Sequence, residues 1–289
     1  MSISSDVPGD VKVTVIIVTW NGRQHLEPCL EALAAQTRRD FEVIVVDNAS
    51  TDGTVELLRE SYPHVRLLCN ADNLGFAVAN NQGIRASSAP FVATLNNDTI
   101  PDPEWLAALL RSFESAEADS RLGAVASKMV FADAPHVVNS CGIALDPAGI
   151  AWDLWGGRPA QLVDRPREVF GACAGAALYR RGMLDDVGLF DEDFFAYFED
   201  LDLAWRALQR GWRCVLAPDA VVRHHHSGTL GEGSPVKRYL LARTNRWSND
   251  QSRGHALGPG SGCVLRQLIR FAGHGIVFAA CGRVNGPPG

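Results

Sequence analysis

The sequence predicts an α/β domain with a mostly parallel central sheet flanked by helices. Apolar β-rich runs alternate with helical patterns through the first part of the chain, an order typical of βαβ units. The runs lack the alternation of half-exposed strands, as expected when both faces of a sheet are buried. Each run also ends on polar residues, at the edge where such sheets bind ligands.

The first half of the chain is read from the spacing of its apolar residues. VTVIIVT at 13–19 is a continuous β-rich run, and the apolar residues of 25–36 then recur every three or four positions. Asp102 is the expected N-cap of the last helix of this half, with Pro103 as its first residue. The predicted order is strand 13–19, helix 25–36, strand 41–47, helix 53–62, strand 65–69, helix 76–86, strand 91–95 and helix 102–117.

The pattern changes after about residue 122, where strand-like pieces alternate with loops rich in Gly, Pro and Trp. We interpret residues 1–250 as one domain, with halves at 11–121 and 122–250. Residues 251–289 form a short Gly-rich tail, for which a flexible segment and a membrane-surface segment are alternatives. The second half is predicted to contain strands 123–131 and 136–145, loop 146–159, small-residue segment 171–181, helix 200–210, strands 212–218 and 220–226, and a basic helix 235–249.

The charge of the chain excludes one class of partner. Of the 289 residues, 46% are hydrophobic and 21% charged, as in a globular protein. The net charge of −6 argues against a general nucleic-acid binder. The C-terminal part differs, because residues 236–289 contain eight Lys or Arg and a single acid, Asp250. Peripheral membrane contact is therefore an alternative for this end.

The predicted location is the cytoplasm. The seven cysteines are scattered without a CxxC pair, which suggests reduced thiols. The N-terminal residues do not have the pattern of a signal peptide, and no apolar stretch reaches about 18 residues. The apolar segment 268–282 is short and carries Arg270 and His274. We expect a cytoplasmic protein, with the inner face of the plasma membrane as the alternative site.

Polar residues follow four of the predicted strands, and parallel strands bring such ends to one edge. Asp47 can accept hydrogen bonds from a ring N–H or a hydroxyl, although a helix N-cap is the alternative role. Asn73 and Gly75 precede a helix whose N-terminus could face a phosphate, or they form an ordinary turn. The four polar strand ends are Trp20-Asn21, Asp47-Asn48, Asn70 to Asn73, and Asn96-Asn97-Asp98.

The strand ending in Asn96-Asn97-Asp98 is a candidate metal site. One carboxylate with amide and carbonyl oxygens suits Mg²⁺ or Mn²⁺ when diphosphate oxygens complete the shell. In a strand, His224 and His226 share a face, and one imidazole could bind the same ion. The alternative is a polar strand end without a ligand.

Acidic residues crowd among aromatic ones in 190–212. Carboxylates at a helix start are favoured by the helix dipole, which is the structural explanation for Glu199 and Asp200. A carboxylate in aromatic surroundings can also have a raised pKa and serve as a general base.

Taken in this order, the motifs resemble those of the family 2 glycosyltransferases with the GT-A fold, above all the rhamnosyltransferase-like bacterial branch. The likeness runs from about residue 13 to residue 247. Its parts are VIIVTWNG, VDNASTDGT, NLGFAVANNQG, LNNDT, GACAGAALYRR, GLFDEDFFAYFEDLDLAWRALQRG and the strand reaching His224. The resemblance implies inverting, metal-dependent transfer of a sugar from a nucleotide diphosphate sugar, UDP- or dTDP-linked such as dTDP-rhamnose. The implied acceptor is a hydroxyl of a glycan or lipid-linked molecule in cell-surface polysaccharide synthesis.

The resemblance also implies roles for single positions. Asp98 matches the acid of the DxD metal motif, His224 matches a metal- or diphosphate-binding histidine, and the implied ion is Mg²⁺ or Mn²⁺. Asp200 matches the catalytic base. The positions matched to nucleotide-sugar contacts are Thr19, Trp20, Asn21, Asp47, Asn73, Gly75, Asn96 and Asn97, and those matched to the donor-sugar and acceptor pocket are Gly171, Ala172, Gly175 and Glu199.

Two other functions compete with this one. A sugar nucleotidylyltransferase would need a Gly-rich loop with Arg or Lys near the N-terminus, and VTWNGRQ does not have that pattern. A non-catalytic nucleotide-sugar or carbohydrate-binding module would not depend on Asp200. The basic residues of the predicted C-terminal helix suit an anionic lipid-linked diphosphate or merely a solvated face. They are Lys237, Arg238, Arg243 and Arg246.

Overall fold

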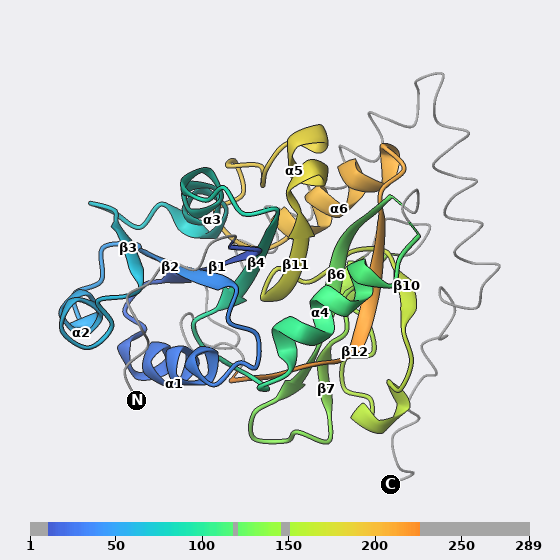
Figure 1. Cartoon of the computed structure of the whole chain (residues 1–289), viewed down its shortest axis with the longest axis horizontal. Helices are drawn as coiled ribbons and strands as arrows, with labels where there is room; N and C mark the ends of the chain where they lie inside the picture. Colours follow the sequence, from blue (N-terminus) through green and yellow to red (C-terminus); the bar gives the residue numbers. More distant parts are fainter. Residues whose placement is uncertain (1–10, 118–120, 146–150, 226–289) are drawn as a thin grey trace, which may run out of the picture.

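The computed structural model describes residues 11–117, 121–145 and 151–225 (Figure 1). The predicted basic helix 235–249 and tail 251–289 lie outside the described residues. Helices lie on both faces of one ten-stranded sheet, and β8 and β9 form a separate hairpin.

The strands are β1 (Val13–Thr19), β2 (Phe41–Asp47), β3 (Arg66–Cys69), β4 (Phe91–Asn96), β5 (Thr99–Pro101), β6 (Leu122–Phe131), β7 (Val138–Ser140), β8 (Ile143–Leu145), β9 (Ala151–Asp153), β10 (Arg167–Val169), β11 (Ala176–Arg180) and β12 (Arg213–His224). The helices are α1 (Arg23–Ala34), α2 (Thr54–Ser61), α3 (Gly75–Ala86), α4 (Trp105–Glu114), α5 (Arg181–Val187) and α6 (Glu199–Gln209), with a short 3₁₀ turn η1 (Ala160–Leu162).

The sheet is mostly parallel, as predicted. Its main path runs β10-β12-β6-β11-β4-β1-β2-β3. Strands β3, β2, β1 and β4 are parallel neighbours, and β12 is parallel to β6. Strand β11 is antiparallel to both β4 and β6, so these two strands run in the same direction. The carboxyl ends of β1, β2, β4 and β12 therefore meet at one edge.

Two apolar clusters hold the sheet, one on each face. Helices α1, α2 and α4 contribute to one cluster, and α3, α5 and α6 to the other; Figure 1 shows the two groups on opposite sides of the sheet. The neighbours Ile16 and Ile17 belong to different clusters, and both are fully buried. Burial on both faces explains the continuous apolar run, and each such side chain stabilises the fold by about 1.5–3 kcal/mol.

The predicted start of the helix at 102 is wrong. Helix α4 begins at Trp105, and no side chain caps it. Asp102 instead continues the β5 edge, because its N–H donates to Val221 O and its carbonyl accepts Gln36 Nε2 at 2.8 Å. Its carboxylate faces Arg223 at 3.5 Å. The carbonyl of Asp102 also accepts Trp105 N–H at 2.9 Å, whereas its side chain faces β12 and does not cap the helix.

Two other boundaries differ from the prediction. The strands expected at 212–218 and 220–226 are one strand, β12, whose register shifts between Ala217 and Val221. Such an irregularity tolerates a proline in a strand, and Pro218 lies within it. The strand expected at 136–145 is divided into β7 and β8 around Gly142, whose φ of +106° is in the left-handed region.

In the described part of the chain, no helix has the length and apolar character needed to cross a membrane.

Candidate active site

A cavity of about 480 Å³ opens at the edge where the parallel strands end. Its volume suits a small-molecule ligand. Most of the predicted site residues line it, although they come from distant parts of the chain. These are Trp20, Asn73, Gly75, Asn96, Asn97, Asp98, Gly175, Glu199, Asp200 and His224. Thr19, Asn21, Asp47, Gly171 and Ala172 do not belong to its lining.

The ends of β4 and β12 bring Asp98 and His224 together. Their Oδ1 and Nε2 atoms are 3.2 Å apart, and both side chains are about nine-tenths buried. His224 Nδ1 lies 2.8 Å from Asn139 Oδ1, which can only accept, so Nδ1 is the protonated nitrogen. Nε2 and the carboxylate then need a proton or a cation between them. This donor set fits a divalent metal ion.

Two protein ligands do not complete a metal shell. Among the residues that the structure describes, no group of three His, Cys, Asp or Glu side chains could hold an ion. A metal bound by Asp98 and His224 would therefore need further oxygen ligands from a substrate or from water. His225 N–H donates to Asp98 O at 2.9 Å and ties the end of β12 to this residue, whereas His226 lies outside the described residues.

Asn97 and Thr19 hold the first strand end in place. Asn97 Nδ2 donates to Thr19 Oγ1 at 3.0 Å, and the amide lies so close to Gly22 that a Cβ there would collide with it. Thr19 is buried and away from the cavity. Its observed contact is thus structural, while Asn96 and Asn97 both face the cavity.

The turn after β2 is held by Asp47, the last residue of that strand, and by Asn21, which follows β1. Asp47 Oδ2 accepts Ser50 N–H at 3.0 Å, and its buried Oδ1 has no partner in the described part of the chain. Asn21 Oδ1 accepts Thr51 N–H at 2.8 Å. Asn21 therefore fastens the turn, and Asp47 retains one buried oxygen that a ligand N–H or O–H could satisfy.

The first N–H groups of α3 are bonded to other residues of the chain. Gly75 N–H donates to Asn73 Oδ1 at 3.0 Å, and Phe76 N–H donates to Phe195 O at 2.6 Å. A Cβ on Gly75 would collide with Phe195, and the φ of Gly75 is +86°. The glycine thus admits the backbone of the loop before α6. These two N–H groups, which were expected to face a phosphate, already have partners.

Helix α6 opens with two adjacent carboxyls. Asp200 Oδ2 accepts Ala174 N–H at 3.0 Å and Oδ1 accepts Leu201 N–H at 2.8 Å. Burial nevertheless raises the pKa of Asp200 to about 6. Burial, followed by repulsion from Asp200, raises the pKa of Glu199 to about 8. Glu199 Oε2 is buried and has no partner among the described residues. Near neutral pH the pair holds one proton, mainly on Glu199.

The residues before α6 are strained. Tyr197 and Phe198 have φ values of 72° and 69°, which bulky side chains rarely adopt. Each such residue costs about 1–3 kcal/mol and persists only when its surroundings fix it. Both line the cavity, so the strain is located at the candidate site.

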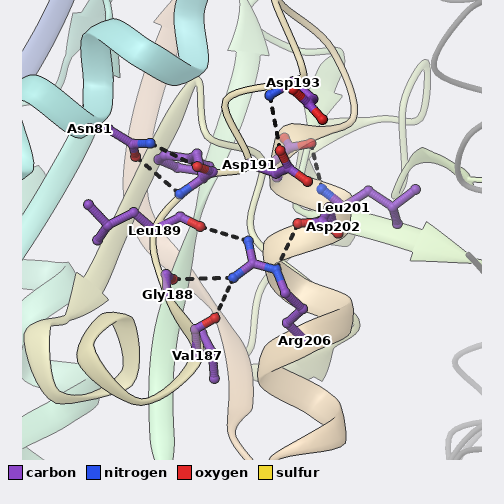
Figure 2. A network of polar contacts seen from close by, with 11 residues as sticks. Asn81, Val187, Gly188, Leu189, Asp191, Asp193, Leu201, Asp202 and Arg206 are labelled. Carbon is purple, nitrogen blue, oxygen red and sulfur yellow. Dashed lines mark hydrogen bonds and ion pairs between the residues drawn. The ribbon is translucent and has the colours of Figure 1, made fainter.

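A network around Arg206 holds the start of this loop (Figure 2). The guanidinium donates to Val187 O at 2.6 Å and Leu189 O at 2.7 Å, and its Nε bonds Asp202 at 2.8 Å. Asn81 bonds both backbone groups of Phe190, at 2.8 and 3.1 Å. The segment from α5 to α6 is thereby fastened to α3 and to α6 itself.

The small-residue segment before β11 lies partly behind the site. Gly175 lines the main cavity, close to the amide of Asn96. Gly171 and Ala172 line a second cavity of about 20 Å³, and a Cβ on Gly171 would collide with Ala204. The predicted pocket floor is thus formed by Gly175 and Cys173, while Gly171 packs on α6.

Several cavity residues could not be found from the sequence. Asn139 orients His224 across 85 residues of chain, and nothing local marks it. Trp152 and Asp153 lie in a segment that only its Gly, Pro and Trp content made conspicuous. Phe195 is marked only by the aromatic content of its loop.

The comparisons with known proteins agree on the family. Residues 14–188 match the family described as Glycosyl transferase family 2. The chain is 32% identical over 241 residues to N-acetylglucosaminyl-diphospho-decaprenol L-rhamnosyltransferase of Mycobacterium tuberculosis, which spans 75% of this chain and 77% of that protein. It is 26% identical over 226 residues to poly-beta-1,6-N-acetyl-D-glucosamine synthase of Staphylococcus aureus, across 76% of this chain and 51% of the relative.

Solved structures share the fold. GalNAc-T7 with UDP, GalNAc and Mn²⁺ matches with a TM-score of 0.60 and 15% identity, over 75% of this chain and 44% of that one. The mannosyltransferase PcManGT from Pyrobaculum calidifontis, with GDP-Man and Mn²⁺, matches with a TM-score of 0.55 and 21% identity, over 93% and 83%. The predicted GT-A fold is confirmed. By the family match and its mycobacterial relative, the chain belongs to glycosyl transferase family 2 and is a rhamnosyltransferase-like glycosyltransferase.

Proposed function

We propose that the protein is an inverting, divalent-metal-dependent enzyme that uses a UDP- or dTDP-linked sugar. The acceptor is a hydroxyl of a lipid-linked molecule or a glycan. The observation that carries the proposal is that Asp98, His224 and Asp200 line one cavity. The residues that could bind a cation and the residue that could accept a proton therefore face the same cavity. The rhamnosyltransferase relative makes dTDP-rhamnose the first donor to test.

The nucleotide would lie toward the ends of β1 and β2. Trp20 and Asn73 line this part of the site, and an indole offers a flat surface for a base. Asp47 is proposed to accept a hydrogen bond from the base or ribose, because its buried Oδ1 has no partner in the described residues. Thr19 and Asn21 would support this end indirectly, through the contacts that hold Asn97 and the turn after β2.

The diphosphate would lie beside Asp98 and His224. A divalent ion bound there would stabilise the negative charge that develops on the leaving diphosphate. Asp98 and His224 would hold the ion, and Asn139 keeps His224 Nε2 turned toward Asp98. Mg²⁺ and Mn²⁺ both accept this combination of ligands with phosphate oxygens.

Asp200 would accept the proton of the acceptor hydroxyl. Its pKa of about 6 keeps most of the group ionised at neutral pH, and two backbone N–H groups orient it. A single displacement at the anomeric carbon inverts its configuration and needs one base, unlike the two carboxyls of a glycosidase. Glu199, which holds a proton at this pH, would be a neutral carboxylic acid in the pocket and could donate a hydrogen bond there.

The acceptor is proposed from the relative and from the charge of the C-terminal part. The mycobacterial relative is named for an acceptor with a lipid-linked diphosphate. The basic residues of 236–289 would attract such an anion at a membrane surface, which supports a location at the inner face of the plasma membrane. Family membership removes the nucleotidylyltransferase alternative.

The metal assignment is tested by Asp98→Asn, which keeps the size of the side chain and removes its charge. We expect the variant to lose Mn²⁺-dependent binding of UDP and dTDP in calorimetry. Asp219→Asn is the control, because Asp219 is an exposed acid of β12 away from the cavity. Unchanged Mn²⁺-dependent binding in Asp98→Asn would refute the role of Asp98.

A further inference from the structure

A large aromatic side chain stands exposed on the wall of the cavity. Trp152 is 43% exposed, although an indole gains much from burial. In the described part of the chain, the other exposed large apolar side chains are Leu74 and Leu162, and neither belongs to the lining. An exposed indole on the wall of a cavity is typical of a surface that a ligand covers.

The hairpin that carries Trp152 packs against α6 near its start. Ile143 and Leu145 of β8 pack with Leu201 of α6 in one apolar cluster. Ile143 N–H also donates to Gly171 O at 2.8 Å. Since α6 begins with Glu199 and Asp200, the hairpin and the base are held on elements that pack against each other.

Trp152 is carried by a different element from the residues proposed to bind the nucleotide. Trp20 and Asn73 come from the ends of β1 and β3, whereas the hairpin packs on α6 and contacts the segment before β11. Trp152 and Asp153 line the same cavity as Asp200. The charge of Asp153 also contributes to the raised pKa of Asp200, as expected of a nearby carboxylate.

We propose that Trp152 is the platform on which a sugar ring of the acceptor stacks, with Asp153 accepting hydrogen bonds from ring hydroxyls. A pyranose has an apolar C–H face that matches an indole and a polar edge that matches a carboxylate. The ring that carries the reacting hydroxyl must lie beside the base, and Trp152 and Asp153 line the same cavity as Asp200. This inference rests on the proposed function and adds its acceptor subsite.

The test measures transfer by the full chain from dTDP-rhamnose with Mn²⁺ to a short-chain N-acetylglucosaminyl-diphospho-lipid. Trp152→Ala should raise the KM for this acceptor about tenfold. The KM for the donor and the slow hydrolysis of the donor by water should stay within about twofold. Trp152→Phe should restore most of the acceptor affinity, because it keeps a flat apolar ring. Leu162→Ala is the control, since Leu162 is 49% exposed outside the cavity.

Binding of the acceptor to Trp152 can also be measured directly, without sugar transfer. The indole N–H signals of the ¹⁵N-labelled protein are recorded during titration with the acceptor lipid, and Trp152 is assigned by its loss in Trp152→Phe. The Trp152 signal should move. An unchanged acceptor KM in Trp152→Ala overturns the subsite and leaves the proposed function standing. If the wild type transfers no sugar, the proposed donor and acceptor fail, and an unmoved Trp152 signal then overturns the subsite separately.

Discussion

At the scale of single residues, Glu199 and Asp200 are neighbours in sequence with different surroundings. Asp200 receives two backbone N–H groups, which favour its ionised form. Glu199 Oε2 is buried without a partner among the described residues, and the charge of Asp200 opposes its ionisation. The surroundings thus raise the pKa of Glu199 further than that of Asp200, and Asp200 is the more readily ionised of the two carboxyls.

Asp200→Asn should lower kcat at least about 10²-fold while leaving donor affinity nearly unchanged. In the wild type, kcat/KM should fall as the pH drops through about 6, because Asp200 must be ionised to accept a proton. That acid limb should be missing from the residual activity of the variant. Steady-state kinetics from pH 5 to 9 check both points, and near-wild-type turnover would contradict the role of Asp200.

Glu199→Gln should stabilise the protein increasingly as the pH rises. The folded-state pKa of Glu199 is raised above its unfolded value, so the folded state binds more protons in the window between them. Stability of the wild type is therefore lost as the pH rises from about 4.5 toward 8. A neutral amide avoids this loss, which is on the order of 5 kcal/mol between pH 4.5 and pH 8.

Urea unfolding at pH 5, 7 and 9 measures the difference between Glu199→Gln and the wild type. Glu60→Gln, on the exposed side of α2, is the control and should leave the pH dependence unchanged. A Glu199→Gln curve parallel to the wild type at every pH would show that Glu199 ionises freely in the folded protein.

At the scale of elements, the loop between α5 and α6 is fixed by the Arg206 network. Arg206→Ala would leave the carbonyls of Val187 and Leu189 and the partly buried Asp202 without their cation. The expected loss of unfolding free energy is about 2–4 kcal/mol, measured by urea denaturation. The turnover should also fall, because the strained Tyr197 and Phe198 lie between this network and Asp200.

Arg210→Ala is the matched control for Arg206→Ala. Arg210 lies one turn further along the chain, is 62% exposed, and pairs with Asp186 at the surface. A surface ion pair of this kind contributes little to stability, so Arg210→Ala should lose much less unfolding free energy than Arg206→Ala. Equal losses for the two variants would mean that the loop does not depend on the Arg206 contacts.

At the scale of the whole molecule, the sheet and the meeting of its polar ends were predictable because they follow from strand order. The ends of parallel strands share one edge, so Asp98, His224 and Asn96 could be placed on one site from their sequence positions. The start of α4 could not be placed, since Asp102 pairs with Gln36, which follows α1, and with Val221 of β12.

Contacts between distant segments of the chain could also not be predicted from the sequence. The glycine of α3 was expected to admit a phosphate, and the structure shows Phe195 at that position, from a loop more than 100 residues later in the chain. The pairing of Asn139 with His224 and the docking of the β8–β9 hairpin on α6 depend on the same kind of packing. Local patterns identify strand ends, and tertiary structure decides what each end touches.

A ligand that binds only the folded protein should raise the melting temperature of the whole domain. UDP or dTDP with Mn²⁺ at about 100 times Kd should add ~2.7 kcal/mol, which corresponds to about 5–10 °C for a domain of this size. Because the proposed site is completed by metal and diphosphate together, EDTA should cancel most of the shift.

Asp98→Asn should show little of this shift even with Mn²⁺, since its remaining ligand, His224, offers one nitrogen to the ion. Differential scanning fluorimetry with nucleotide alone, Mn²⁺ alone and both together separates the contributions. A full shift by nucleotide in EDTA would show that the diphosphate is held without a metal. The contact between Asp98 and His224 would then be an ion pair of the folded protein. The proposed role of Asp98 as a metal ligand would be refuted, while the proposed role of Asp200 as the proton acceptor would remain to be judged from its own variant.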